Sequence, residues 1–198
     1  MQEISPTLVK DLREKTGAGI MDCKRALAET SGDLDRAVDF LRKKGIATAE
    51  KKSWRAANQG VVGAYVHAGG ALGVLVEVNC ETDFVAKTDE FQALVRDLAM
   101  QIAAAHPLVV RRDELAPDVI AREREIYRAQ AEGTGKPPQV VEKIIDGKIE
   151  KFYQERCLEE QAFVKDSEKT IKALVTEKIA LLGENISIRR FARFKLGE

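Results

Sequence analysis

The sequence predicts an α+β protein, and two changes in the spacing of its apolar residues support this prediction. Apolar residues recur every three to four positions through the first 45 residues, which is the period of a helix with one buried face. The period changes to two between residues 60 and 79, as in a strand, and then returns to the helical value. We therefore expect an N-terminal three-helix domain followed by a core domain, in which helices cover a small three-stranded antiparallel sheet and a helical hairpin projects.

The N-terminal domain is expected to span residues 1–45. Ser5 followed by Pro6 is typical of a helix start, and Gly17 or Gly19 would end that first helix. A second helix follows, and a third would end at Gly45. Three short helices in about 45 residues make a small bundle of marginal size.

A linker is expected over residues 46–58. It mixes alanines with basic side chains and reads as a basic helical segment. Its Trp54 could stack on a nucleic acid base, because every base offers a flat face to an aromatic ring. A lone tryptophan is more often packed, however, and we expect Trp54 to lie against the adjoining domain.

The core domain is expected to span residues 59–198. Its sheet would combine a hairpin over residues 60–79 with a last strand over residues 185–194. A helix over residues 89–105, capped by Thr88, carries one continuous apolar face and would cover the sheet.

A helical hairpin is expected over about residues 117–156. Its two amphipathic stretches are joined by a turn, Gly133-Thr134-Gly135-Lys136-Pro137-Pro138. This turn contains Gly-Lys but lacks the four-residue spacer and the Ser or Thr of a phosphate loop, so it does not indicate nucleotide binding. Gly183 would end the final helix, just before the last strand.

The candidate site is the stretch between the β-hairpin of residues 60–79 and the helix over residues 89–105. Thr82 can cap a short helical turn, which would direct the carboxylate of Asp83 and the ring of Phe84 outward together. An aromatic ring on such a turn suits separating packed elements of a partner. The alternative is that Phe84 belongs to the core and Asp83 is an ordinary helix-start residue, and spacing alone favours this alternative.

Composition bounds the kind of partner. The 198-residue chain has 32 Lys plus Arg and 32 Asp plus Glu, so its formal net charge is zero. A protein that mainly neutralises phosphates would show a basic excess, and this balance fits a protein partner instead.

Cys23, Cys80 and Cys157 are far apart and outside any metal-ligand spacing, which indicates three reduced thiols in a cytoplasmic protein. No apolar run approaches the length of a membrane span, so no membrane association is expected.

Catalytic chemistry is weakly supported, and we expect no enzyme activity, metal or cofactor. His67 and His106 are the only candidate bases at neutral pH, and neither lies near a nucleophile pattern. Cys80 lies beside Glu81 and Asp83, whose charges would raise the pKa of its thiol rather than activate it.

Two long stretches resemble the sequence signatures of translation elongation factor Ts. They are Leu12-Arg13-Glu14-Lys15-Thr16-Gly17-Ala18-Gly19-Ile20-Met21-Asp22-Cys23-Lys24-Arg25-Ala26-Leu27 and Glu77-Val78-Asn79-Cys80-Glu81-Thr82-Asp83-Phe84-Val85-Ala86-Lys87. The resemblance covers nearly the whole chain, including Gly135-Lys136-Pro137 in the hairpin and Gly183-Glu184-Asn185-Ile186 near the end. The β-hairpin pattern of residues 60–79 occurs only once in the sequence, as in the short bacterial form of this family. Longer forms carry two similar core halves.

This resemblance implies a guanine-nucleotide exchange factor for elongation factor Tu in translation elongation. The factor would bind its partner both GDP-bound and nucleotide-free, and would promote GDP release by disturbing the partner's magnesium and nucleotide site. The residues implied in this intrusion are Thr82, Asp83, Phe84 and Val85, with Phe84 as a wedge between partner helices.

The resemblance also implies a role for the N-terminal domain. This domain would be similar to the ubiquitin-associated fold and would dock on the nucleotide-binding domain of elongation factor Tu through Leu12, Arg13, Ile20 and Met21. Many relatives have methionine at the place of Ile20, so this contact should be similar but stiffer. Ala162 stands where the family usually has proline, which should loosen that turn slightly.

Two further expectations concern partners. A three-stranded sheet leaves two free edges and one poorly covered face, which a second copy of the chain could hide in a symmetric homodimer. The alternative function is an RNA- or ribosome-associated module, using the basic side chains Lys51, Lys52, Arg55, Arg189, Arg190 and Arg193 together with Trp54. The zero net charge and the two motifs argue against direct nucleic-acid binding.

Overall fold

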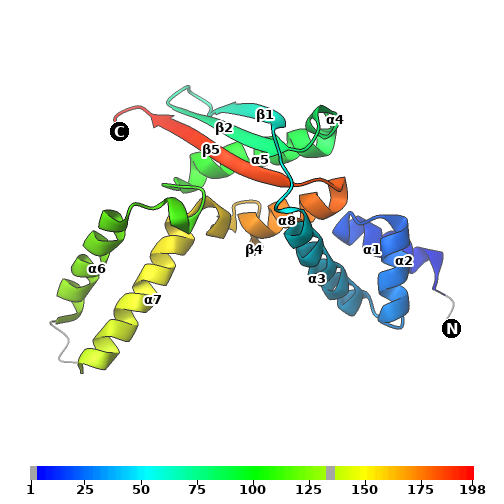
Figure 1. Cartoon of the computed structure of the whole chain (residues 1–198), viewed down its shortest axis with the longest axis horizontal. Coiled ribbons are helices and arrows are strands. Elements are labelled where there is room, and N and C mark those ends of the chain that lie inside the picture. Colours follow the sequence, from blue (N-terminus) through cyan, green and yellow to red (C-terminus); the bar gives the residue numbers. More distant parts are fainter. Residues whose placement is uncertain (1–3, 133–136) are drawn as a thin grey trace. The chain divides into compact units, whose positions relative to one another are not determined.

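The computed structural model describes residues 4–132 and 137–198, which form helices and a small three-stranded sheet (Figure 1). This mixed architecture confirms the predicted α+β class. In chain order, its elements are α1 (Pro6–Thr16), α2 (Ile20–Glu29), α3 (Leu34–Lys52), β1 (Gln59–Val66), β2 (Leu72–Cys80), α4 (Asp83–Ala86), α5 (Asp89–Ala105), η1 (Arg112–Glu114), α6 (Pro117–Glu132), α7 (Pro138–Arg156), η2 (Leu158–Glu160), β3 (Ala162–Phe163), β4 (Asp166–Thr170), α8 (Ile171–Leu182) and β5 (Ile186–Lys195).

The chain divides into two compact units, each assembled from segments that are distant in the sequence. The first unit contains Met1–Val61, Val78–Leu94 and Ala173–Ser187. The second contains Val62–Glu77, Val95–Lys172 and Ile188–Glu198. The candidate turn around Thr82 belongs to the first unit.

In the first unit, α1, α2 and α3 pack around a small apolar core (Figure 1). The Ser5 side chain caps α1 with Pro6 at its first position, and Gly17 ends it in a left-handed conformation, as predicted. The buried residues of this core are Val9, Leu12, Cys23, Ala26, Leu27 and Ala37.

The predicted end of the third helix at Gly45 is wrong. Helix α3 continues through this glycine to Lys52 and includes part of the expected linker. Gly45 is buried, and a Cβ at this position would lie 3.6 Å from the Cβ of Ala180 in α8. Tertiary packing therefore overrides the weak helix propensity of glycine, which a reading of the local sequence does not detect.

The sheet has the strand order β1-β2-β5 and is antiparallel (Figure 1). The side chains of Val74, Val76 and Val78 alternate inward along β2, as the sequence period predicts. A Cβ on Gly63 of β1 would lie 2.2 Å from a methyl carbon of Val95, so α5 approaches this strand too closely for any side chain. Helix α5 thus covers the sheet here, as expected.

In the second unit, α6 and α7 lie side by side as the predicted antiparallel helical hairpin (Figure 1). Arg124 pairs with Asp146 at 2.8 Å, and Arg128 pairs with Glu142 at 2.8 Å, so ion pairs join the two helices. Of the turn between them, Gly133–Lys136 lies outside the described residues, and so does most of the family-like stretch Gly135-Lys136-Pro137.

Residues 162–170 contain a two-stranded sheet that the sequence did not predict. Strands β3 and β4 pair antiparallel, with an irregular register between Ala162 and Phe163. Strand β4 is the polar stretch Asp166-Ser167-Glu168-Lys169-Thr170, which has no apolar alternation. A period-two search cannot find a strand of this composition.

Candidate partner-binding site

The candidate site is the turn between β2 and α4. Thr82 has an extended backbone (φ −127°, ψ 155°), and its hydroxyl oxygen accepts a hydrogen bond from the Val85 amide at 3.3 Å. It is therefore the N-cap of α4, as predicted. Val85 is half-buried and Ala86 is buried, so the turn is anchored on one side only.

Phe84 lies on the open side of this turn with 79% of its surface exposed. The alternative interpretation, in which Phe84 belongs to the core, is therefore wrong. The short helix turns Ala86 inward, and this leaves the larger ring outside. A phenylalanine this exposed contributes little to folding, which makes it a candidate contact residue.

Asp83 lies beside the ring and is also exposed. Its carboxylate accepts a hydrogen bond from the Lys87 ammonium group at 2.6 Å, one helical turn further on. The hydrogen bond and the charge of Lys87 lower the pKa of Asp83. The turn thus presents an ionised carboxylate and an aromatic ring together.

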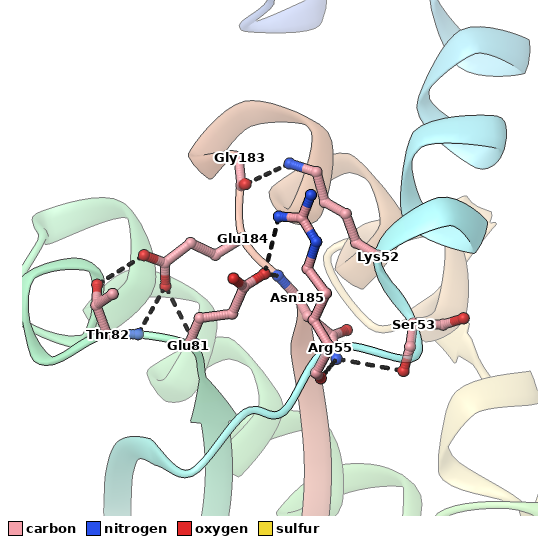
Figure 2. Close-up of polar contacts among 8 residues, drawn as sticks. All are labelled: Lys52, Ser53, Arg55, Glu81, Thr82, Gly183, Glu184 and Asn185. Atoms are coloured by element: carbon pink, nitrogen blue, oxygen red, sulfur yellow. Dashed lines mark hydrogen bonds and ion pairs between the residues drawn. The ribbon is translucent and has the colours of Figure 1, made fainter.

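Polar contacts that the sequence analysis did not predict hold the base of this turn (Figure 2). Glu184, between α8 and β5, accepts hydrogen bonds from the amides of Glu81 (3.1 Å) and Thr82 (3.0 Å). Its other carboxylate oxygen accepts from the Thr82 hydroxyl at 2.6 Å. Glu184 lies in a stretch noted as family-like, but no sequence spacing indicates that it reaches Thr82, which is 102 residues away.

The residue after Glu184 completes the connection. The Asn185 amide donates to a carboxylate oxygen of Glu81 at 2.6 Å, and that oxygen also pairs with Arg55 at 3.5 Å. The side-chain amide of Asn185 donates to the carbonyl oxygens of Arg55 (2.7 Å) and Ser53 (3.4 Å). We call Arg55, Glu81, Thr82, Glu184 and Asn185 the turn clasp (Figure 2).

The residues expected to dock the N-terminal domain lie around the first helix junction. Arg13, Ile20 and Met21 are exposed, Arg13 near the end of α1 and the other two at the start of α2. Leu12 is fully buried in the bundle core. Leu12 therefore fixes α1 from beneath, whereas the other three side chains are available on the surface.

Trp54 is 80% exposed, so the prediction that it packs against an adjoining domain is wrong. It follows the end of α3, where the chain bends before Arg55 enters the turn clasp. Charge and local spacing cannot reveal which way such a bend directs a side chain.

Most of the basic side chains considered for nucleic-acid binding have protein partners. Lys52 donates to the carbonyl oxygen of Gly183, and Arg55 pairs with Glu81. Arg190 pairs with Glu77 at 2.7 Å, and Arg193 pairs with Glu198 at 2.6 Å. Three of these four partners are carboxylates, which offset the charges of Arg55, Arg190 and Arg193.

The structure also places the three cysteines and the side chains that could bind a metal ion. Cys23, Cys80 and Cys157 are buried free thiols. Burial raises the pKa of Cys80, and the nearby Glu184 carboxylate raises it further, so this thiol is not activated. Residues 4–132 and 137–198 contain no group of three or more His, Cys, Asp or Glu side chains placed to hold a metal ion. Over the same residues, no helix is both long and apolar enough to cross a membrane.

Comparison with known proteins identifies the family. The family model described as "Elongation factor TS" matches residues 46–198. Elongation factor Ts from Geotalea uraniireducens (strain Rf4) is 63% identical over 195 residues, which cover 98% of this chain and 90% of that protein. The Geobacter sulfurreducens protein of the same name is 62% identical with the same coverage, and that of Desulforamulus reducens is 58% identical over 198 residues, covering 100% of this chain and 91% of the relative. These matches confirm the resemblance drawn from the two motifs, and the chain belongs to the elongation factor Ts family of translation elongation factors.

Proposed function

We propose that this protein is a guanine-nucleotide exchange factor for elongation factor Tu, acting in the cytoplasm by binding rather than by catalysing a covalent step. The observation that carries the proposal is the exposed ring of Phe84, presented beside the ionised Asp83 on a capped turn. Family membership supplies the partner, because factors of this family act on elongation factor Tu.

Slow nucleotide release explains why such a factor is needed. A nucleotide held at nanomolar affinity, with an association rate of ~10⁶ M⁻¹s⁻¹, leaves at only ~10⁻³ s⁻¹. A factor that binds the nucleotide-free partner more tightly than the loaded one weakens nucleotide binding by the same ratio. The factor must therefore bind both forms of the partner and stabilise the empty one.

The turn suits a disturbance of the magnesium site. Mg²⁺ requires near-ideal octahedral geometry, so a small displacement of its ligands weakens the hold on the phosphates. In the proposed complex, Phe84 inserts between partner helices near that site, and Asp83 disturbs the local charge arrangement. Thr82 and Val85 contribute by fixing the turn, Thr82 as its cap and Val85 as the amide donor to that cap.

The N-terminal residues 1–45 are proposed to dock on the partner's nucleotide-binding domain, with residues 46–58 as the connection to the core of residues 59–198. Arg13, Ile20 and Met21 are exposed on adjacent ends of α1 and α2 and offer one charged and two apolar contacts. Leu12 supports them from within the bundle.

Release of a fluorescent GDP analogue from elongation factor Tu, followed by stopped flow, tests this function. The wild-type chain should accelerate release by orders of magnitude. Phe84→Ala should retain much of the binding to the nucleotide-free partner but reduce the maximal acceleration at least ~10-fold, since the inserting group is lost. Wild-type rates with Phe84→Ala, or no acceleration by the wild type, would contradict the proposal.

Trp54→Ala is the matched control, because Trp54 and Phe84 are equally exposed aromatic side chains. It should leave nucleotide release unchanged. The same variant tests the alternative function, an RNA-associated module, which the exposure of Trp54 near Lys51 favours. That alternative expects tight RNA binding with a steep dependence on salt in a filter-binding assay, and a loss of binding in Trp54→Ala.

We also propose a symmetric homodimer through the sheet. Val62, Val66 and Leu75 are exposed on the face of β1 and β2 opposite to the one that α5 covers. A second copy could bury these side chains, because a two-fold axis places the same patch on both chains. Light scattering at micromolar concentration should give twice the mass of the chain, and a monomeric mass would contradict the dimer.

A further inference from the structure

The turn that carries Phe84 is too short to hold its own orientation. Helix α4 has four residues, and a helix of this length lacks the internal hydrogen bonds that would stabilise it in isolation. Its exposed ring also contributes little packing. The direction of Phe84 therefore depends on contacts at the base of the turn, together with the burial of Ala86.

Glu184 provides three of these contacts with a single carboxylate. One oxygen accepts from the consecutive backbone amides of Glu81 and Thr82, and the other accepts from the Thr82 hydroxyl (Figure 2). Hydrogen bonds to an ionised acceptor are roughly twice as strong as neutral ones. One side chain thus fixes both the backbone and the cap at the entry to the turn.

The contact with Glu184 also determines that the Thr82 hydroxyl acts as an acceptor in the helix cap. The proton of the Thr82 hydroxyl is donated to Glu184 at 2.6 Å, so a lone pair of the same oxygen faces the Val85 amide at 3.3 Å. Glu184 therefore orients the hydroxyl as an acceptor for α4. Removal of the carboxylate would free the hydroxyl to rotate and would weaken the cap directly beneath Phe84.

The connection is reciprocal, which gives it a defined geometry. Glu184 accepts from the amide of Glu81, and Glu81 in turn accepts from the amide of Asn185. Each of two neighbouring segments thus supplies a carboxylate to the backbone of the other. Arg55 offsets the negative charge by pairing with Glu81 at 3.5 Å.

We infer that Glu184 is a positioning residue for nucleotide exchange, which sets the orientation of the Asp83–Phe84 turn without needing to contact the partner itself. This inference rests on the proposed exchange function. It assigns to Glu184 an effect on the maximal rate of exchange, whereas an ordinary surface carboxylate would affect neither rate nor binding.

The first experiment measures GDP-analogue release from elongation factor Tu over a range of concentrations of Glu184→Ala, Glu184→Gln and wild type. We expect Glu184→Ala to lower the maximal rate at least ~10-fold, as a misplaced group does, with a smaller change in the half-saturating concentration. Glu184→Gln keeps one acceptor oxygen and should fall between the two. Asp97→Asn is the control, since it removes another carboxylate that bridges distant segments, to Lys165 at 2.7 Å, and should match the wild type.

The cap itself provides a second pair of variants. Thr82→Ser keeps the hydroxyl and should retain most of the wild-type maximal rate, whereas Thr82→Val keeps the shape but loses both the donor and the acceptor. Thr82→Val should therefore resemble Glu184→Ala. A double variant of Glu184→Ala and Thr82→Val should be little worse than Glu184→Ala alone, because Glu184→Ala already removes the hydroxyl contact that Thr82→Val removes.

A partner-free measurement separates this inference from the proposed function. Amide hydrogen exchange of Glu81 and Thr82 should be faster in Glu184→Ala, while the amides of the α1–α3 core keep their wild-type protection. If the wild type fails to accelerate release, the exchange function is overturned and the role of Glu184 with it. If the wild type accelerates release and Glu184→Ala does so equally, or if the two amides stay protected in that variant, the positioning role alone is overturned.

Discussion

Two polar networks in this molecule use similar groups for different ends. In the turn clasp, Glu184 and Glu81 are half-buried and hold backbone amides beneath the exposed Phe84. In the second unit, Gln101 and Gln161 are almost completely buried. Gln101 donates to the Gln161 side chain at 3.0 Å and accepts from the Val164 amide at 2.9 Å, while Gln161 donates to the Glu155 carbonyl at 2.7 Å.

The difference lies in what water can replace. A half-buried carboxylate that loses a partner can be solvated, so the free energy of unfolding changes little while the local geometry is lost. A buried amide without partners pays the full desolvation penalty, so the loss appears in the stability of the whole unit. The clasp should therefore matter most for exchange, and the glutamine pair most for folding.

The largest expected effect on stability is that of Gln101→Leu. It leaves the Val164 amide and the Gln161 carbonyl oxygen without this partner in the core, and should lower the free energy of unfolding by about 2–4 kcal/mol. Denaturant unfolding measures the change, with Gln130→Leu on the exposed surface as the control. GDP release per folded molecule should remain at the wild-type value. If Gln101→Leu lost exchange activity without losing stability, the buried glutamine pair would serve exchange rather than folding, contrary to this prediction.

Asn185→Ala should have an intermediate effect. Its side-chain amide is buried and donates to the carbonyl oxygens of Arg55 and Ser53, so its removal should lower the free energy of unfolding by about 1–2 kcal/mol. The backbone amide of residue 185 still reaches Glu81, so the reciprocal part of the clasp survives. A loss as large as that of Gln101→Leu would show that the clasp supports the unit as strongly as the core pair does.

The buried thiol of Cys157 should make the stability of the protein depend on pH at alkaline pH. Burial, with a further contribution from Glu160, raises the pKa of Cys157 from 9.0 to about 11. The unfolded chain loses this proton first, so the stabilisation is complete below pH 9 and is lost as the pH rises toward 11. Between these limits the wild type should lose about 1–2 kcal/mol more than Cys157→Ala in reducing buffer. Denaturant unfolding at pH 8 and pH 10.5 measures this loss. If the wild type and Cys157→Ala lose the same free energy of unfolding between these pH values, the raised pKa is contradicted.

The smallest expected effect is that of Trp54→Ala on stability. The side chain is 80% exposed, so its removal should change the free energy of unfolding by less than about 0.5 kcal/mol. Because Trp54 is the only tryptophan, its fluorescence should also show full access to a soluble quencher in the folded chain. Protection from the quencher would place Trp54 in contact with other side chains.

Local chemistry predicted much of this fold from the sequence. The caps at Ser5 and Thr82 and the helix end at Gly183 depend on a few adjacent residues, and the structure confirms each of them. The sheet and its covering helix followed from the change of period. These features need no knowledge of distant contacts.

Features that depend on distant contacts were missed. Helix α3 continues through Gly45 because α8 packs there, and the polar strand β4 exists because β3 pairs with it. The exposure of Phe84 was proposed from the turn, although spacing alone favoured the core. Glu184 could not be connected to Thr82 at all, because a contact between residues 102 positions apart leaves no periodic pattern.

The distance in sequence between Thr82 and Glu184 also determines when the turn clasp can form during synthesis. During synthesis from the N-terminus at ~5–20 residues per second, about 5 to 20 s pass between the addition of Thr82 and that of Glu184. A growing chain thus carries Phe84 long before it carries the carboxylate that binds the entry to its turn. Until then the Asp83–Phe84 turn lacks this support, and a ribosome-bound fragment cannot present it to a partner as the finished protein does.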